Sequence, residues 1–145
     1  MYIEVQNGKR FEKYIDAVVQ VLGLDYFDAD IEIEFAPKLD GDAGGYCHGD
    51  DEEVIVEIAT KCMGEKIEKD QILQNIAHEL IHAQQILTGR LKDFGLQIVN
   101  ECLVKAQEWD GEYYTNVKYA DQPWEIDAYG REEEVKLKAL EVLNA

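Results

Sequence analysis

The sequence lacks the features that mark membrane-bound and exported proteins. Its 145 residues contain no apolar run of about 18 residues, the length that a membrane-spanning helix requires. Residues 1–5 have neither the basic region nor the apolar core of a standard secretion signal. These absences predict a chain that has no membrane partner and stays in the cytoplasm.

Cysteine is also scarce. Cys47, Cys62 and Cys102 are odd in number and widely spaced, and no C-x-x-C pair occurs. The simplest interpretation is three free thiols in a reducing compartment, which agrees with a cytoplasmic location.

Basic residues are few relative to acidic ones. The chain has 14 lysines and arginines against 31 aspartates and glutamates, a net charge of −17 at pH 7. Phosphate contacts require a basic surface, so this balance argues against nucleic-acid binding. The charge could favour basic substrates or partners through electrostatic steering, although solubility alone accounts for it equally well. A third interpretation is an acidic decoy that mimics nucleic-acid charge and occupies a DNA-binding protein.

Only three histidines are present, and two of them stand in one H-E-x-x-H motif, His78-Glu79-Leu80-Ile81-His82. Residues four apart on a helix lie one turn apart on the same face, so His78 and His82 can direct two imidazoles at one metal ion. Glu79 stands beside the first ligand, where its carboxylate can reach a water held by the metal. The spacing therefore predicts a zinc site whose catalytic carboxylate is Glu79.

The helix that carries the motif is expected to span residues 70–88, with Gly89 just past its C-terminal end. On a helical wheel its apolar residues gather opposite His78 and His82, and Gln85 lies beside the histidines. A helix of this kind is suited to form a wall between a core and a cleft. The alternative is a solvent-facing helix that carries the two histidines by chance.

A catalytic zinc ion takes three protein ligands and one open position, so a third ligand is needed. The best candidate is Glu125, in a helix predicted over Pro123–Leu143, because Pro123 suits the first helical turn. Tyr129 shares the helix face of Glu125, whereas Asp127 points roughly 200 degrees away and is the weaker candidate. The alternative role for Glu125 is a favourable interaction with the helix dipole, and the two roles are compatible.

These motifs resemble those of a known family. The chain is similar to small zinc metallopeptidases of the gluzincin type, and more narrowly to uncharacterised bacteriophage-encoded proteins that pair H-E-L-I-H with a downstream P-W-E-x-x-A-Y helix. The stretches that carry the resemblance are residues 77–85, 109–111 and 123–131. It implies one Zn²⁺ ion held by His78, His82 and Glu125, with Glu79 as the catalytic carboxylate and the host cytoplasm as the location. The extended motif of the metzincins is absent, because no histidine follows His82.

The predicted reaction is hydrolysis of a peptide bond by a water that the metal activates and Glu79 deprotonates. A hydrogen-bond donor to the developing oxyanion is usual in such a site, and Tyr129 is the first candidate because it shares the helix face of Glu125. Other tyrosines that could supply this donor are Tyr113, Tyr114 and Tyr119. His48, in a loop over residues 44–49, is a fourth metal ligand, a substrate contact or simply an exposed side chain.

The order of the predicted elements gives an α+β fold in a single domain, residues 1–145. Hydrophobic spacing predicts a helix over residues 8–22 and two strands, residues 30–35 and Glu53–Ala59. After the motif helix it predicts a hairpin, in which an Asp110-Gly111 turn joins Cys102–Trp109 to Glu112–Thr115. The resemblance implies that this N-terminal helix, small sheet, active-site helix, hairpin and C-terminal helix form a zincin-like minimal metalloprotease domain.

The sequence thus supports three classes of function. The first is a zinc metallopeptidase acting on a peptide or protein substrate, which could be basic. Its substrate is expected to lie in extended form between the strand Glu53–Ala59 and the motif helix. The second class is a zinc-stabilised binding or inhibitory protein without turnover, and the third is the acidic decoy. The run of residues 132–134 is interpreted only as a solvated face of the last helix.

Overall fold

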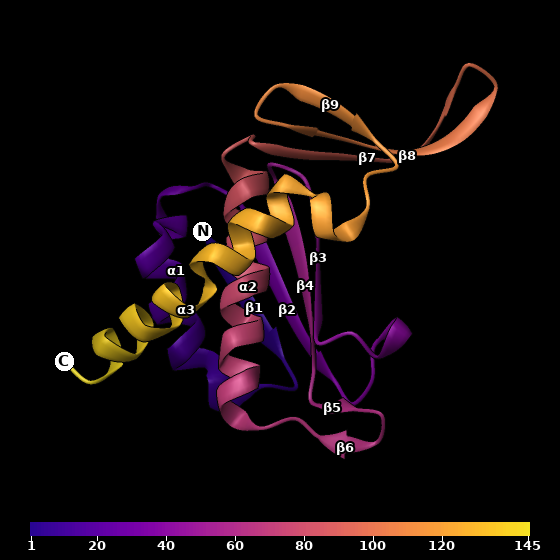
Figure 1. Cartoon of the computed structure of the whole chain (residues 1–145). Helices are drawn as coiled ribbons and strands as arrows, with labels where there is room; N and C mark the ends of the chain where they lie inside the picture. Colours follow the sequence, from indigo (N-terminus) through magenta and orange to yellow (C-terminus); the bar gives the residue numbers. More distant parts are fainter.

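A four-stranded sheet forms the centre of the structure, a computed structural model that describes residues 1–145. Its strands lie in the spatial order β1 (Tyr2–Gln6), β2 (Asp30–Ala36), β4 (Glu53–Ala59) and β3 (Gly45–Gly49) (Figure 1). The first three run parallel, and β3 pairs antiparallel with β4 along the outer edge. The mixed α+β class that the sequence predicts is confirmed.

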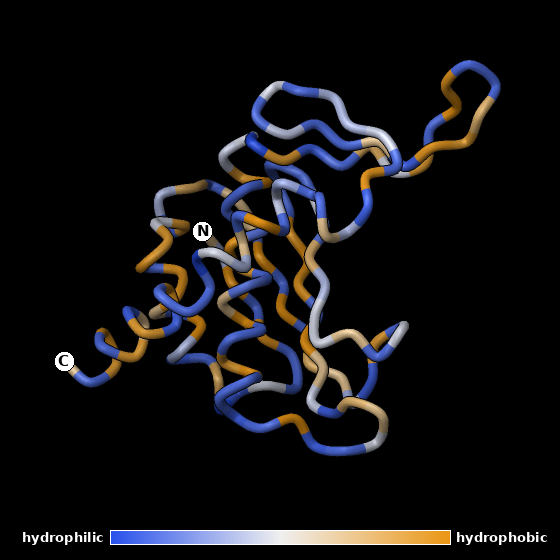
Figure 2. The backbone as a smooth tube through the Cα atoms, in the orientation of Figure 1, coloured by the Kyte–Doolittle hydropathy of each residue, from blue (hydrophilic) through white to orange (hydrophobic).

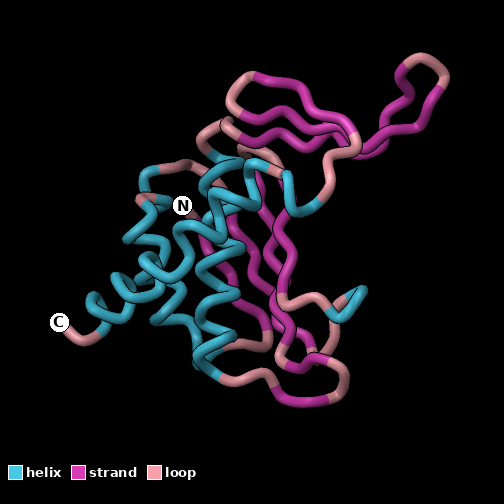
Figure 3. The backbone as a smooth tube through the Cα atoms, in the orientation of Figure 1, coloured by secondary structure: helices cyan, strands magenta, loops and turns pink.

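Three helices lie together beside this sheet: α1 (Glu12–Leu22), α2 (Lys69–Leu87) and α3 (Pro123–Leu143) (Figure 3). Successive side chains of a strand point to opposite faces, and in β2 and β4 every second residue is a buried aliphatic or aromatic one. These residues and the apolar sides of the helices share one core cluster of 30 buried residues.

The motif helix α2 is the centre of the helical layer. It contacts β3 and β4 as well as the other two helices, and 13 of its 19 residues are buried. Polar side chains reinforce this packing: Tyr14 of α1 donates to the Leu73 carbonyl, and Gln84 donates to the Leu22 carbonyl. A solvent-facing helix with two accidental histidines is therefore excluded.

Most predicted elements have the expected bounds. β4, α3 and both hairpin strands agree with the prediction. β2 ends one residue later than predicted, and α2 begins and ends one residue earlier. The predicted N-terminal helix begins instead as a 3-10 turn, η1 (Lys9–Phe11), before α1. Gly8 precedes this turn and lies so close to the Phe35 ring that a Cβ atom would collide with it.

Five strands were not expected from the sequence: β1, β3, β7 (Leu91–Val99) and the short pair β5 (Lys61–Cys62) and β6 (Glu65–Lys66). The segment around His48 is predicted as a loop, but Gly45–Gly49 forms β3, because β4 offers a row of backbone groups that need partners. This pairing also corrects the expected substrate strand. β4 is an inner strand between β2 and β3, so an extended peptide cannot pair with it, and the sheet edge on that side is β3.

A separate antiparallel sheet contains β7 (Leu91–Val99), β8 (Cys102–Trp109) and β9 (Glu112–Thr115). Asp110 and Gly111 form the predicted turn, and their φ values of 49° and 86° are both positive, as a two-residue hairpin of type I′ requires. The long β7–β8 hairpin, called here the arm (residues 91–109), projects from the body, and apolar stretches lie on both strands near its tip (Figure 2).

Short elements fill the remaining connections. They are the 3-10 turns η2 (Leu24–Tyr26), η3 (Asp40–Asp42) and η4 (Tyr119–Asp121), and the two-stranded ribbon of β5 (Lys61–Cys62) and β6 (Glu65–Lys66). None of the helices combines the length and the apolar character that crossing a membrane requires.

Candidate metal centre

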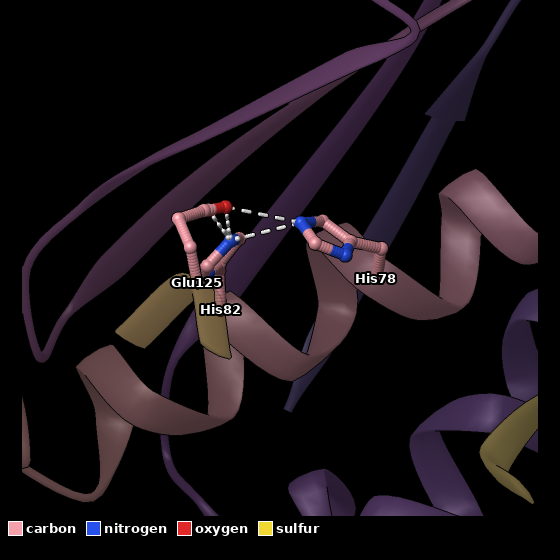
Figure 4. Close-up of side chains that lie close together, drawn as sticks. All are labelled: His78, His82 and Glu125. Carbon is pink, nitrogen blue, oxygen red and sulfur yellow. Dashed lines mark hydrogen bonds and ion pairs between the residues drawn. The ribbon is translucent and has the colours of Figure 1, made fainter. Parts of the chain in front are cut away.

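Two helices bring the predicted ligands together. His78 and His82 lie one turn apart on α2, and Glu125 lies in the first turn of α3, which Pro123 begins (Figure 4). One ligand atom from each of these three residues lies within 4.8 Å of the others, and all three residues are buried. The ligand set predicted from the sequence therefore forms one cluster at the contact between α2 and α3.

The distances within the cluster fit a bound cation. The Nε2 atoms of His78 and His82 lie 3.2 Å apart, and Oε1 of Glu125 lies 3.1 Å from the first and 2.7 Å from the second. Tetrahedral zinc, with bonds of about 2.0–2.1 Å, places its ligand atoms about 3.3 Å apart. Two imidazoles and a carboxylate are also a donor set that zinc commonly takes. The cluster can thus hold a divalent metal ion and leave one coordination position free.

A carboxylate supports the first histidine. Nδ1 of His78 lies 3.0 Å from Oε2 of Glu132 and donates to it, because a carboxylate only accepts. In the neutral ring the lone pair is then on Nε2, where a metal can bind. The interpretation of Glu132 as part of a solvated face is wrong, since α3 crosses α2 and turns this residue toward His78. The spacing held a signal: Glu132 follows Glu125 by about two turns on the same helix face.

An amide supports the second histidine. Nδ1 of His82 donates to Oε1 of Gln85 over 2.7 Å, while Nε2 of Gln85 donates to the Trp124 carbonyl and to Asp127, both over 2.9 Å. Asp127 therefore faces Gln85 and not the cluster, as expected for the weaker ligand candidate. It is held there by Arg131, which donates to both of its carboxylate oxygens.

Burial and charge together set the protonation of the ligands. Burial lowers the pKa of both histidines, but their contacts with Glu125 and the surrounding acidic groups raise it above the ordinary value overall. Burial raises the pKa of Glu125, yet the two imidazoles outweigh this effect and bring it down to about 2. Glu125 is consequently negative at neutral pH, which suits a ligand for a cation.

Glu79 lies on the side of α2 that faces β3. A Cβ atom on Gly45 would come within 2.8 Å of Cγ and 3.0 Å of Oε2 of Glu79, so a larger residue on the strand would displace this side chain. Burial raises the pKa of Glu79 to about 7, although both histidines oppose the shift. Glu79 is not one of the three clustered ligands, so its carboxylate is available for another role.

Two tyrosines border the cluster. The hydroxyl of Tyr119 lies 3.4 Å from Oε1 of Glu125 and 2.7 Å from the hydroxyl of Tyr129, whose ring packs against His78 with centroids 4.5 Å apart. Burial raises the pKa of Tyr119 above its usual range, so its hydroxyl keeps its proton and can donate. The predicted Tyr129 is thus at the site, and Tyr119, one of the alternatives, approaches the ligand carboxylate directly.

The cluster opens into a cleft of about 630 Å³ bordered by α2, α3, β3 and the base of the arm. Leu91, Asp93 and Gln107 line it from the arm. The cleft contains four carboxylates and no lysine or arginine; the acidic residues are Glu79, Asp93, Glu125 and Glu132. The cleft is therefore acidic, like the protein as a whole.

Other candidate residues lie away from the cluster. His48 is exposed on β3, with Nε2 3.8 Å from a carboxylate oxygen of Glu57, and it does not line the cleft. Tyr113 and Tyr114 do not line it either. Cys47 does line the cleft, and burial raises the pKa of its free thiol well above the ordinary value.

A comparison of the chain with known protein families, curated proteins and solved structures finds no significant match. Its function has to be inferred from the site itself. The cluster, the side chains that support it and the acidic cleft are the features that bear on that inference.

Proposed function

We propose that the protein is a zinc-dependent metallopeptidase. The observation that carries this proposal is the buried cluster of His78, His82 and Glu125, with Glu79 of the same helix in the wall of the adjoining cleft. A structural zinc site normally has four protein ligands, whereas a catalytic site has three and an open position. Three ligands beside a cleft support catalysis over a purely structural ion.

The proposal includes a zincin-like fold. Its support is the packing of the motif helix α2 against a mixed sheet whose outer strand, β3, is antiparallel and borders the cleft. The third ligand comes from a separate helix, α3. The outer backbone groups of β3 have no partner strand, so an extended peptide can pair with them beside the cluster.

The residues of the cleft have distinct roles in this reaction. A bound zinc ion supplies Lewis acidity, which favours deprotonation of a water near neutral pH and polarises the scissile carbonyl. Glu79 takes a proton from the attacking water as its oxygen bonds to the carbonyl carbon, and passes that proton to the nitrogen as the C–N bond breaks. The hydroxyl of Tyr119 or Tyr129 donates to the developing oxyanion.

The charge of the cleft favours basic substrates. Its four carboxylates and the net charge of −17 attract cationic peptides and repel acidic ones. No lysine or arginine lines the cleft to hold the C-terminal carboxylate of a substrate. Internal peptide bonds flanked by basic residues are therefore the proposed targets.

The test is cleavage of a peptide library that contains basic, neutral and acidic members. Glu79→Gln should reduce cleavage by about 10²–10⁴-fold, the usual contribution of a general base, and should still bind zinc. Glu133→Gln is the matched control, because Glu133 is exposed on α3 and makes no contact with the cluster. Its activity should equal that of the wild type.

Two results would count against the proposal. Unchanged cleavage by Glu79→Gln would remove Glu79 from the reaction. Zinc bound by the wild type, with no cleavage of any library member, would instead favour a zinc-stabilised binding protein.

A further inference from the structure

Gln85 is a buried polar side chain for which the proposed reaction has no direct use. It is 0% exposed, although glutamine is usually found at protein surfaces. All of its hydrogen-bonding partners lie within the site or directly next to it: His82, the Trp124 carbonyl and Asp127. A buried amide with this many short contacts is costly to remove or to rotate.

The contacts fix the orientation of the amide. The Trp124 carbonyl and the Asp127 carboxylate are both acceptors, so the NH₂ group of Gln85 has to face them. Its oxygen then faces Nδ1 of His82 and accepts the proton of that nitrogen. In the neutral ring that a metal ligand requires, the single proton of His82 is then on Nδ1, and the lone pair of Nε2, which lies beside Glu125, can bind a cation.

Gln85 also connects the two helices that supply the ligands. It belongs to α2, as His82 does, but it donates a hydrogen bond to the backbone carbonyl of Trp124, the residue directly before Glu125 on α3. One side chain thereby fixes the position of the His82 ring relative to the first turn of α3. The carboxylate of Glu125 lies 2.7 Å from Nε2 of His82 under this constraint.

We infer that Gln85 is a positioning residue. It fixes where the His82 imidazole lies relative to the Glu125 carboxylate, and so determines how tightly the cluster binds a divalent cation. This inference rests on the proposed metal site, but it does not require peptide cleavage. Asp127 and Arg131 extend the support, since Arg131 holds Asp127 and Asp127 holds the Gln85 amide.

The amide is required for a chemical reason. A carboxylate at position 85 would still accept from His82, but it would face the Trp124 carbonyl and Asp127 with no hydrogen to donate. Gln85→Glu therefore keeps the support of the ring and breaks the link to α3. Gln85→Ala removes both contacts, so the two variants separate the connection between helices from the support of one imidazole.

Gln84 offers a matched control. It is the adjacent glutamine of α2 and also joins helices, because it donates to the Leu22 carbonyl and accepts from Arg131. It makes no contact with His82 or Glu125. Arg131 reaches Gln84 through Nη1 but holds Asp127 through Nε and Nη2, so the hydrogen bonds to Asp127 do not depend on Gln84. Gln84→Ala thus removes the same chemical group and a comparable set of interhelical contacts without touching the ligands.

The experiment measures zinc affinity by competition with a chromophoric chelator, the visible absorption spectrum of the cobalt-loaded protein, and the melting temperature without metal. Gln85→Ala and Gln85→Glu should each bind zinc about 10–100-fold more weakly than the wild type, the usual effect of losing a residue that orients a metal ligand. Their cobalt spectra should shift. Gln84→Ala should melt at a lower temperature but keep the wild-type zinc affinity and cobalt spectrum.

Wild-type zinc affinity and an unchanged cobalt spectrum in Gln85→Glu would overturn the inference, and this variant keeps the test valid if Gln85→Ala does not fold. An equal loss of affinity in Gln84→Ala would overturn it too, since any interhelical contact would then have the same effect. Failure of the proposed function looks different: the wild type would bind zinc and cleave nothing, while the Gln85 variants would still bind zinc more weakly.

Discussion

The helix pair that holds the metal cluster and the arm that borders the cleft are built in opposite ways. Around His78 and His82 the polar groups are paired, and no buried side-chain nitrogen or oxygen of the protein lacks a hydrogen-bond partner. On the arm, Ile98 and Leu103 face each other across β7 and β8 and are 78% and 65% exposed. The comparison shows that α2 and α3 hold the ligands in place, whereas the arm contributes its base, Leu91 and Trp109, to the core and its exposed tip contributes little to the fold.

Metal removal should produce the largest contrast between the two regions. Zinc present at about 1,000 times its Kd stabilises a folded site by about 4 kcal/mol, which corresponds to roughly 10 °C in melting temperature for a chain of this size. A chelator should lower the melting temperature by that amount. Amide exchange at the tip of the arm should be fast with or without metal, because those strands are exposed. Equal melting temperatures in both conditions would contradict a metal that joins α2 to α3.

A pair of substitutions on α3 should separate a ligand from a supporting residue. Glu125→Ala should weaken zinc binding by more than about 100-fold, because even residues that only support a ligand cost 10–100-fold. Asp127→Ala should cost about 10-fold, because it acts through Gln85. Competition with a chromophoric chelator measures both. A greater loss in Asp127→Ala than in Glu125→Ala would show that the third ligand is assigned wrongly.

Adjacent glutamates on α3 provide a finer comparison. Glu132→Gln should weaken zinc binding about 10-fold, since the contact to Nδ1 of His78 loses its charge, whereas Glu133→Gln should have no effect. Zinc titration of both variants is the measurement. Identical affinities would mean that the support of His78 by Glu132 has no energetic consequence.

Substitutions on the arm should have the smallest effect. The double variant Ile98→Thr, Leu103→Thr replaces two exposed apolar side chains and should change the free energy of unfolding by about 0.5 kcal/mol or less, with zinc affinity unchanged. Denaturant titration measures the first quantity. A loss above about 2 kcal/mol would show that the arm packs against something essential to the fold.

The sequence predicts those features that depend on local pattern. Pro123 and the spacing after it give the bounds of α3, and the spacing of His78 and His82 gives a ligand pair on one helix face. Glu125 could be predicted because the chemistry of zinc calls for a third ligand. The structure places these three residues together.

Features that arise from contacts between elements far apart in the sequence could not be predicted from local patterns. β3 has two glycines and little apolar alternation. It forms because the backbone groups along one side of β4 would otherwise have no partner strand. The contacts of Glu132 and Gln85 depend on how α3 crosses α2, which no pattern within either helix specifies. For Glu132 and Gln85 the sequence gives only the helix face on which each residue lies.

The most direct test of the central claim is a titration of metal-free protein with zinc, followed by X-ray absorption and by NMR of the imidazole nitrogens. One zinc ion per chain is expected, with Nε2 of His78, Nε2 of His82 and a carboxylate oxygen among its ligands. A protein that takes up no zinc at equimolar concentration, or that binds it with both imidazoles free, would contradict the claim.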